Sequence, residues 1–360
     1  MSIYEESTNP KLGRSKMNLE VIKLGDGWKH YHLKNEKGME VSILNYGGII
    51  TRLLAPDRHG QLENIVLGYK DLKDYKSDSN FFGALIGRVA GRIEKSSFQW
   101  EGKNYLLEAN DGANHLHGGS QGFHQVLWNA EPFQTSKSVG LVLSQRFLAE
   151  QDGYPGNLTV RITYSLTNDN QLVIDYQAKS DQTTPLTLTN HSYFNLSGRL
   201  KRTVHNHVVT MKSERYVELD EQLIPTGKIL NAEQSSFDFR RGRKLKEGIS
   251  SEDKQNLIAG GGYDHYFIFQ EAEEEVIVVT EKESGRRLTI HTDQPGVVMY
   301  SGNQMSDELE LSEGSSKKHL GVCFETQASP ASLHHEGFPS VELKADQPYA
   351  KQTIFTFDTF

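Results

Sequence analysis

His191 lies in a stretch, residues 184–198, where a strand pattern gives way to polar residues. Leu186 and Leu188 alternate with threonines, as in a strand with one buried face. Asparagines, a serine and His191 then occupy positions where a core would hold aliphatic residues, and buried polar groups need partners. An ordinary histidine, with a pKa of about 6.5, exchanges a proton near neutral pH. The stretch indicates either a satisfied histidine at a strand end or, as its dense polar cluster favours, half of an acid–base pair.

Glu325 is the carboxylate that we nominate as the partner of His191. It lies in a second strand pattern, residues 319–330, where apolar residues from Leu320 to Phe324 occupy one face and Glu325 the other. A carboxylate in mid-strand is costly to bury without a partner. A glutamate at the rim of a sheet is the alternative interpretation.

Two glycine-rich loops carry further polar side chains. Residues 81–93 contain Arg88 and Arg92 in an apolar setting, and an arginine there needs an acceptor. We expect one arginine to pair with an acidic residue and the other to be available to a ligand. His115 and His117 are spaced i, i+2, but no further ligand at suitable spacing completes a tetrahedral metal set. We therefore expect hydrogen-bonding histidines and no metal site.

Two other polar residues lie beside strand patterns. Asp264 follows a glycine cluster and precedes an apolar strand, a position often taken by a turn residue. Gln294 precedes a Pro-Gly turn at 295–296. Neither residue alone indicates more than a turn.

The elements that must position these side chains are short strands. Residues 160–178 alternate in polarity around a turn at 168–170, which is a strong β-hairpin signal. Similar hairpins are expected to turn at Gly102 and Gly285, and helical periodicity is almost absent outside one turn at 71–75. We predict an all-β fold, a large antiparallel β-sandwich with few short helices.

Composition and charge narrow the function classes for this chain of 360 residues. Its formal net charge of -8, with both signs interspersed, gives no basic stripe for nucleic acid and no cationic helix for a membrane surface. It has no membrane-length apolar run and no signal peptide, and its one cysteine forms no internal disulfide, so we expect a cytoplasmic protein. Residues 1–16 are predicted to be a flexible arm and residues 17–360 a single domain.

Nine segments of the chain, taken in order, carry a recognisable pattern: NYGGIITRLLAPDRHGQLENIVLGY (45–69), GRVAGRI (87–93), NHLHGG (114–119), DGYPGNLTV (152–160), TPLTLTNHSYFNLSG (184–198), IPTG (224–227), GYDH (262–265), TDQPGVVMYSGN (292–303) and FETQ (324–327). In this order they resemble the aldose 1-epimerase (galactose mutarotase) family. The resemblance implies a galactose mutarotase-like supersandwich whose site lies in an open cleft on one sheet.

The resemblance also implies an activity, the interconversion of α and β anomers of aldoses such as galactose and glucose, without a metal or redox cofactor. His191 matches the general acid and Glu325 the general base. We expect a monomer or homodimer whose partner is a small sugar. Gly91 departs from the asparagine usual in the family, and ASPAS (328–332) stands where relatives often have Asn-Trp-Pro. The positions that match family sugar-binding residues are Arg92, His117, Asp264 and Gln294.

Three alternatives stay open from the residues. A glycoside hydrolase or lyase would need two carboxylates, which Asp264 and Glu325 could supply. A non-catalytic carbohydrate-binding module would need no acid–base pair. An epimerase for phosphorylated hexoses would need an extra cation at the phosphate, and Arg88 is the obvious spare.

Overall fold

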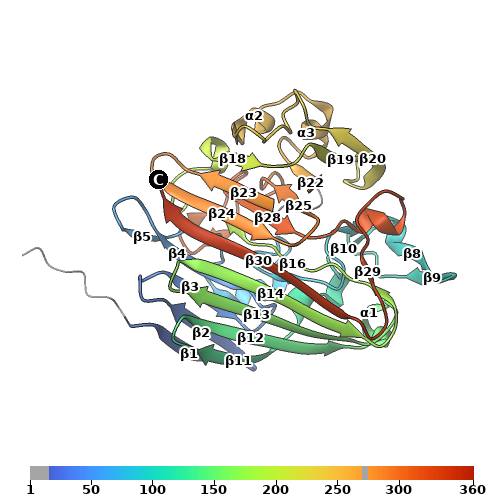
Figure 1. Ribbon diagram of the computed structural model, residues 1–360, viewed down its shortest axis with the longest axis horizontal. Helices are drawn as coiled ribbons and strands as arrows, with labels where there is room; N and C mark the ends of the chain where they lie inside the picture. The colour runs from blue at the N-terminus through green and yellow to red at the C-terminus, as the bar shows by residue number, and fades with distance from the viewer. Residues whose placement is uncertain (1–15, 270–274) are drawn as a thin grey trace, which may run out of the picture.

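The computed structural model describes residues 16–269 and 275–360, which form a fold dominated by antiparallel strands (Figure 1). The predicted all-β sandwich is confirmed, since most strand residues of the described chain belong to three large sheets. The predicted arm at 1–16 lies, apart from its last residue, outside the described residues. That residues 17–360 form one domain stays a prediction.

The largest sheet has nine strands and lies beside sheets of five and six strands. The nine-stranded sheet follows the order β11 (Asn129–Gln134), β12 (Ser138–Phe147), β13 (Leu158–Thr167), β14 (Gln171–Ser180), β30 (Pro348–Thr359), β24 (Arg286–Thr292), β23 (Glu275–Thr280), β18 (Val208–Met211), β21 (Arg243–Lys244). The five-stranded sheet runs β1 (Asn18–Gly25), β2 (Trp28–Lys34), β3 (Glu40–Leu44), β4 (Ile50–Pro56), β5 (Leu62–Asn64). The six-stranded sheet runs β17 (Tyr193–Phe194), β28 (Val322–Thr326), β25 (Gly296–Tyr300), β22 (Asp264–Ile268), β19 (Arg215–Leu219), β20 (Pro225–Asn231).

The predicted hairpins are present in the expected register. In β13 and β14, Leu166 pairs with Leu172 next to the turn, so the apolar residues of both strands point to one face. The turns at Gly102 and Gly285 join β8 (Ser97–Trp100) to β9 (Lys103–Leu106) and β23 to β24. Alternating polarity in the sequence therefore predicts both the strands of this hairpin and the face that is buried.

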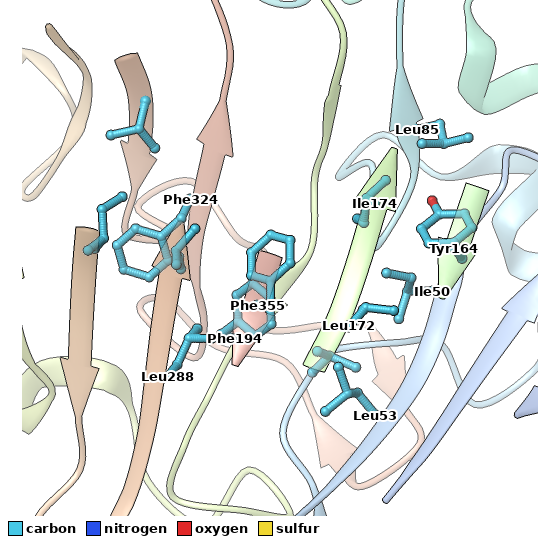
Figure 2. Close-up of a cluster of buried hydrophobic side chains, with 14 of the residues drawn as sticks. Ile50, Leu53, Leu85, Tyr164, Leu172, Ile174, Phe194, Leu288, Phe324 and Phe355 are labelled. Atoms are coloured by element: carbon cyan, nitrogen blue, oxygen red, sulfur yellow. The ribbon is translucent and has the colours of Figure 1, made fainter. Parts of the chain in front are cut away.

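The main core fills the space between the nine-stranded sheet and the other two large sheets. It combines Ile50 and Leu53 from β4, Leu172 from β14, and Phe324 from β28 in one buried cluster (Figure 2). Because side chains alternate along a strand, the neighbours of Phe324 on β28 face away from this core. The six-stranded sheet therefore has a second face that does not pack against the main core.

Helices are short and lie outside the sheets. The predicted turn at 71–75 is a 3-10 helix, η1 (Leu72–Ser77). The α-helices are α1 (Ala149–Asp152), α2 (Lys246–Ile249) and α3 (Lys254–Ile258). Within the described part of the chain, no helix is long and apolar enough to cross a membrane.

Candidate active site

A cavity of about 330 Å³ opens on the second face of the six-stranded sheet. Its size suits a small ligand. Strand register explains how distant segments meet there, because β25 lies between β28 and β22. Of the six predicted site residues, five line this cavity: His191, Glu325, Arg92, His117 and Asp264.

His191 and Glu325 form the centre of the cavity wall. The Nε2 atom of His191 lies 3.4 Å from Oε1 of Glu325, and both side chains are buried. The backbone of His191 is fixed by the glycine-rich loop, since its N–H donates to the Ala84 carbonyl and its carbonyl accepts from Gly83 N–H. The other ring nitrogen, Nδ1, lies 3.5 Å from the Cys323 sulfur. The predicted pair is therefore present, with Nε2 directed at the carboxyl group.

Burial favours the uncharged form of both members of the pair. It lowers the pKa of His191 to about 3. Burial also raises the pKa of Glu325 well above its ordinary value; Asp264 adds to the rise and Arg92 opposes it. Burial thus favours the form of the pair in which the transferable proton is on Glu325 and His191 is uncharged. This direction is opposite to the imidazolium and carboxylate expected from ordinary pKa values, because both side chains are buried.

His117 is held by reciprocal backbone contacts with Gly91. The Gly91 N–H donates to His117 Nδ1 at 3.1 Å, and the His117 N–H donates to the Gly91 carbonyl at 3.2 Å. Burial keeps the pKa of His117 well below 6.5, so the ring is neutral. With Nδ1 accepting, its single proton must sit on Nε2. His117 is thus a fixed hydrogen-bond donor.

This tautomer also decides whether the cavity suits a metal ion. Ligand atoms of His117, His191 and Glu325 all lie within 4.8 Å of one another. A metal-bound histidine needs a free lone pair on one nitrogen and donates its other N–H outward. The Gly91 N–H occupies the outward nitrogen of His117, which leaves the wrong nitrogen protonated. The trio therefore fits hydrogen bonding to a ligand better than metal binding.

Arg92 brings a positive charge to the cavity between two carboxylates. Its Nε donates to Asp111 at 2.7 Å, and its Nη1 lies 3.9 Å from Asp264. Burial raises the pKa of Asp264, and Arg92 partly offsets the rise. These groups supply directional donors and acceptors for hydroxyl groups.

The two arginines of the glycine-rich loop have different roles. Arg88 is buried, pairs with Asp152 at 2.8 Å and donates to the carbonyls of Pro155 and Gly156. Arg88 does not line the cavity and is not available to a phosphate group. The expectation that one arginine would pair with an acidic residue is confirmed, although Arg92 also contacts an aspartate.

Gln294 lies away from the other predicted site residues. Its amide donates to the Leu188 carbonyl and the Tyr349 hydroxyl, and it is not among the described residues that line the cavity. The amide therefore links Leu188 to Tyr349 of β30. The contact with a sugar that the resemblance implied for Gln294 stays a prediction. His115 likewise bonds to the Glu108 carbonyl and does not line the cavity.

Sequence reasoning missed Phe81 and Asp111. Phe81 lines the cavity, has a φ of 58°, and packs with ring centroids 4.7 Å from His117 and 5.7 Å from His191. Positive φ at a bulky residue is uncommon and concentrates at functional sites. Both carboxylate oxygens of Asp78 hold this turn by accepting N–H groups of Asn80 and Phe82. No periodicity in the sequence marks such a turn.

The sequence and fold are similar to those of known proteins. A family model described as Aldose 1-epimerase matches residues 29–356. The chain is 38% identical over 322 residues to galactose mutarotase of Sus scrofa, covering 89% of this chain and 91% of the relative. It is 33% identical over 318 residues to aldose 1-epimerase of Streptococcus thermophilus, covering 86% and 89%. The solved galactose 1-epimerase from Lactobacillus acidophilus NCFM has a TM-score of 0.83 and 27% identity, covering 96% of this chain and 99% of that chain. The residues matched by the family model include all those that line the cavity.

Proposed function

The chain belongs to the aldose 1-epimerase family, and we propose that its reaction, the interconversion of α and β anomers of aldoses such as galactose and glucose, is carried out by His191 and Glu325. The observation that carries the assignment is the 3.4 Å separation of His191 Nε2 and Glu325 Oε1 in one cavity. Both sugar oxygens that exchange protons, O1 and the ring oxygen O5, are bonded to C1. A base and an acid that are close neighbours can therefore serve both from one side of the sugar.

Ring opening requires two proton transfers and the cleavage of one bond. Glu325 removes the proton from the C1 hydroxyl, the C1–O1 bond becomes a carbonyl, and the C1–O5 bond breaks. His191 gives a proton to O5, which leaves the open-chain aldehyde. After rotation about C1–C2 the transfers reverse, and O5 attacks the other face of C1. Atoms and charges balance without any further reactant.

The pair begins each cycle with the one proton that it shares. For Glu325 to act as base and His191 as acid, this proton must move from the carboxyl group to Nε2. We infer that a bound sugar favours this transfer, because its hydroxyl groups can form hydrogen bonds with both charged groups. Arg92 assists, since its positive charge stabilises the Glu325 carboxylate.

Arg92, His117 and Asp264 are proposed to orient the sugar. His117 offers the Nε2–H that Gly91 fixes, whereas Asp264 offers carboxyl oxygens and Arg92 offers N–H groups. Orientation matters because the reacting oxygens must lie within hydrogen-bond reach of both members of the pair.

Polarimetry on freshly dissolved α-D-galactose tests the assignment. The wild type should equilibrate the anomers faster than the spontaneous reaction. His191→Ala and Glu325→Ala should each lose about 10²–10⁴-fold in rate, the usual worth of a positioned acid or base. Exposed His59→Ala and Glu342→Ala are matched controls and should keep the wild-type rate. Wild-type-like activity in either cavity variant would refute the assignment.

Further proposals concern the protein as a whole. We propose that residues 17–360 act as a single domain, in support of which one family model runs from 29 to 356. We also propose a cytoplasmic location and a monomeric or homodimeric state, as expected from the sequence. Size-exclusion chromatography with light scattering tests the last of these.

A further inference from the structure

Gln327 lies directly after the end of β28, two positions beyond Glu325, and lines the same cavity. Its side chain is fully buried. The Nε2 atom donates to the Ala90 carbonyl at 3.2 Å and to the Ala328 carbonyl at 3.1 Å. Both amide hydrogens are thus directed at backbone carbonyls, which fixes the orientation of the amide and leaves Oε1 as its free end.

Oε1 of Gln327 has no hydrogen-bond partner among the described residues. Buried side-chain acceptors are nearly always satisfied, and an exception needs an explanation. The neighbouring wall is closely packed at Gly91, where a Cβ atom would lie only 3.0 Å from Pro330 Cγ and 3.7 Å from Gln327 Nε2. A buried acceptor without a partner, in a residue that lines the cavity, is suited to a donor that arrives with the substrate.

We propose that Oε1 of Gln327 accepts a hydrogen bond from one hydroxyl group of the aldose and so determines which sugars bind well. The inference deepens the proposed function and rests on it. Gln327 is assigned no proton transfer, since an amide oxygen at neutral pH only accepts hydrogen bonds. Its contribution is selection: a sugar that lacks this hydroxyl leaves the buried oxygen unpaired.

The test measures kcat/KM by polarimetry for galactose and its 2-, 3-, 4- and 6-deoxy derivatives, each corrected for the spontaneous rate. With wild-type protein, we expect kcat/KM for at least one deoxy sugar to be about tenfold or more below that for galactose, which is the usual effect of one unpaired buried group. Gln327→Met keeps the length of the side chain but removes the acceptor. This variant should lower kcat/KM for galactose by a similar factor. It should also abolish the preference for galactose over that deoxy sugar.

Gln327→Glu separates recognition from structural support. It keeps an acceptor oxygen but loses the two Nε2–H bonds, and its second oxygen then faces the carbonyls of Ala90 and Ala328, so its structural damage should be at least as large as that in Gln327→Met. We expect Gln327→Glu to retain the preference between galactose and the affected deoxy sugar. If Gln327→Met fails to fold, loss of the preference in Gln327→Glu overturns the proposal.

The proposal is also overturned if Gln327→Met slows all five sugars by the same factor, or if wild-type protein shows no preference among them. Failure of the proposed function would look different. In that case the wild type would accelerate no sugar at all, and no preference could be measured.

Discussion

Replacing Gly91 by alanine should disturb both stability and sugar binding. Gly91 has a φ of +93°, and a Cβ atom there would meet Pro330 at 3.0 Å from Cγ and 3.2 Å from Cδ. The positive φ costs a non-glycine residue about 1–2 kcal/mol. The contact with the rigid proline ring adds about 1–3 kcal/mol, the usual cost of overpacking. We expect Gly91→Ala to lower the free energy of unfolding by the sum of these two terms.

Gly102→Ala is the matched control. Gly102 also has a positive φ, +76°, but a Cβ atom there would have nothing within 4 Å. Urea unfolding followed by circular dichroism should show that Gly91→Ala loses about 1–3 kcal/mol more than Gly102→Ala, since only the first meets a neighbour. Gly91→Ala should also raise KM, because Gly91 positions His117 through two hydrogen bonds. Equal losses of stability in the two variants, with unchanged KM, would refute this reasoning.

Three further outcomes are expected. Because the pKa of His191 is lowered to about 3, kcat/KM should not fall between pH 7 and pH 5, where an ordinary histidine gains a proton, and a midpoint near 6.5 would contradict this. Because the pKa of Glu325 is raised, kcat/KM should fall only as the pH rises through that raised pKa and the shared proton is lost. Asp152→Ala leaves Arg88 buried without its carboxylate partner, so it should lower the free energy of unfolding, measured in urea, by about 3–5 kcal/mol. A decrease of less than about 1 kcal/mol would argue against a stabilising pair. Asp111→Asn removes a charged partner of Arg92 and should raise KM for galactose more than it lowers kcat. A larger effect on kcat than on KM would count against a positioning role.

The sequence predicted the fold well where polarity alternates along strands. The hairpin of β13 and β14 and the two faces of β28 were read correctly, because a buried face imposes a period of two on the residue types. The resemblance placed His191 and Glu325 together, which no local pattern could do for residues 134 positions apart in the sequence. In the structure the two side chains line one cavity, and their catalytic roles stay predictions.

The remaining site residues depend on contacts that sequence does not display. Phe81 reaches the histidines only because Asp78 holds an irregular turn, and Gln294 is taken out of the cavity by its bonds to Leu188 and Tyr349. The preference for a protonated Glu325 follows from the burial of both groups, which is a property of the assembled cavity. Local residue types give no measure of that burial.

The central claim is that His191 and Glu325 act together in one step through one shared proton. The most direct test compares the catalysed rate of α-D-galactose equilibration in the wild type, His191→Ala, Glu325→Ala and the double variant. Groups that act as a unit show strongly non-additive losses, so the double variant should be no slower than the slower single variant. If the two single losses instead multiply in the double variant, the residues act independently and the shared-proton account is wrong.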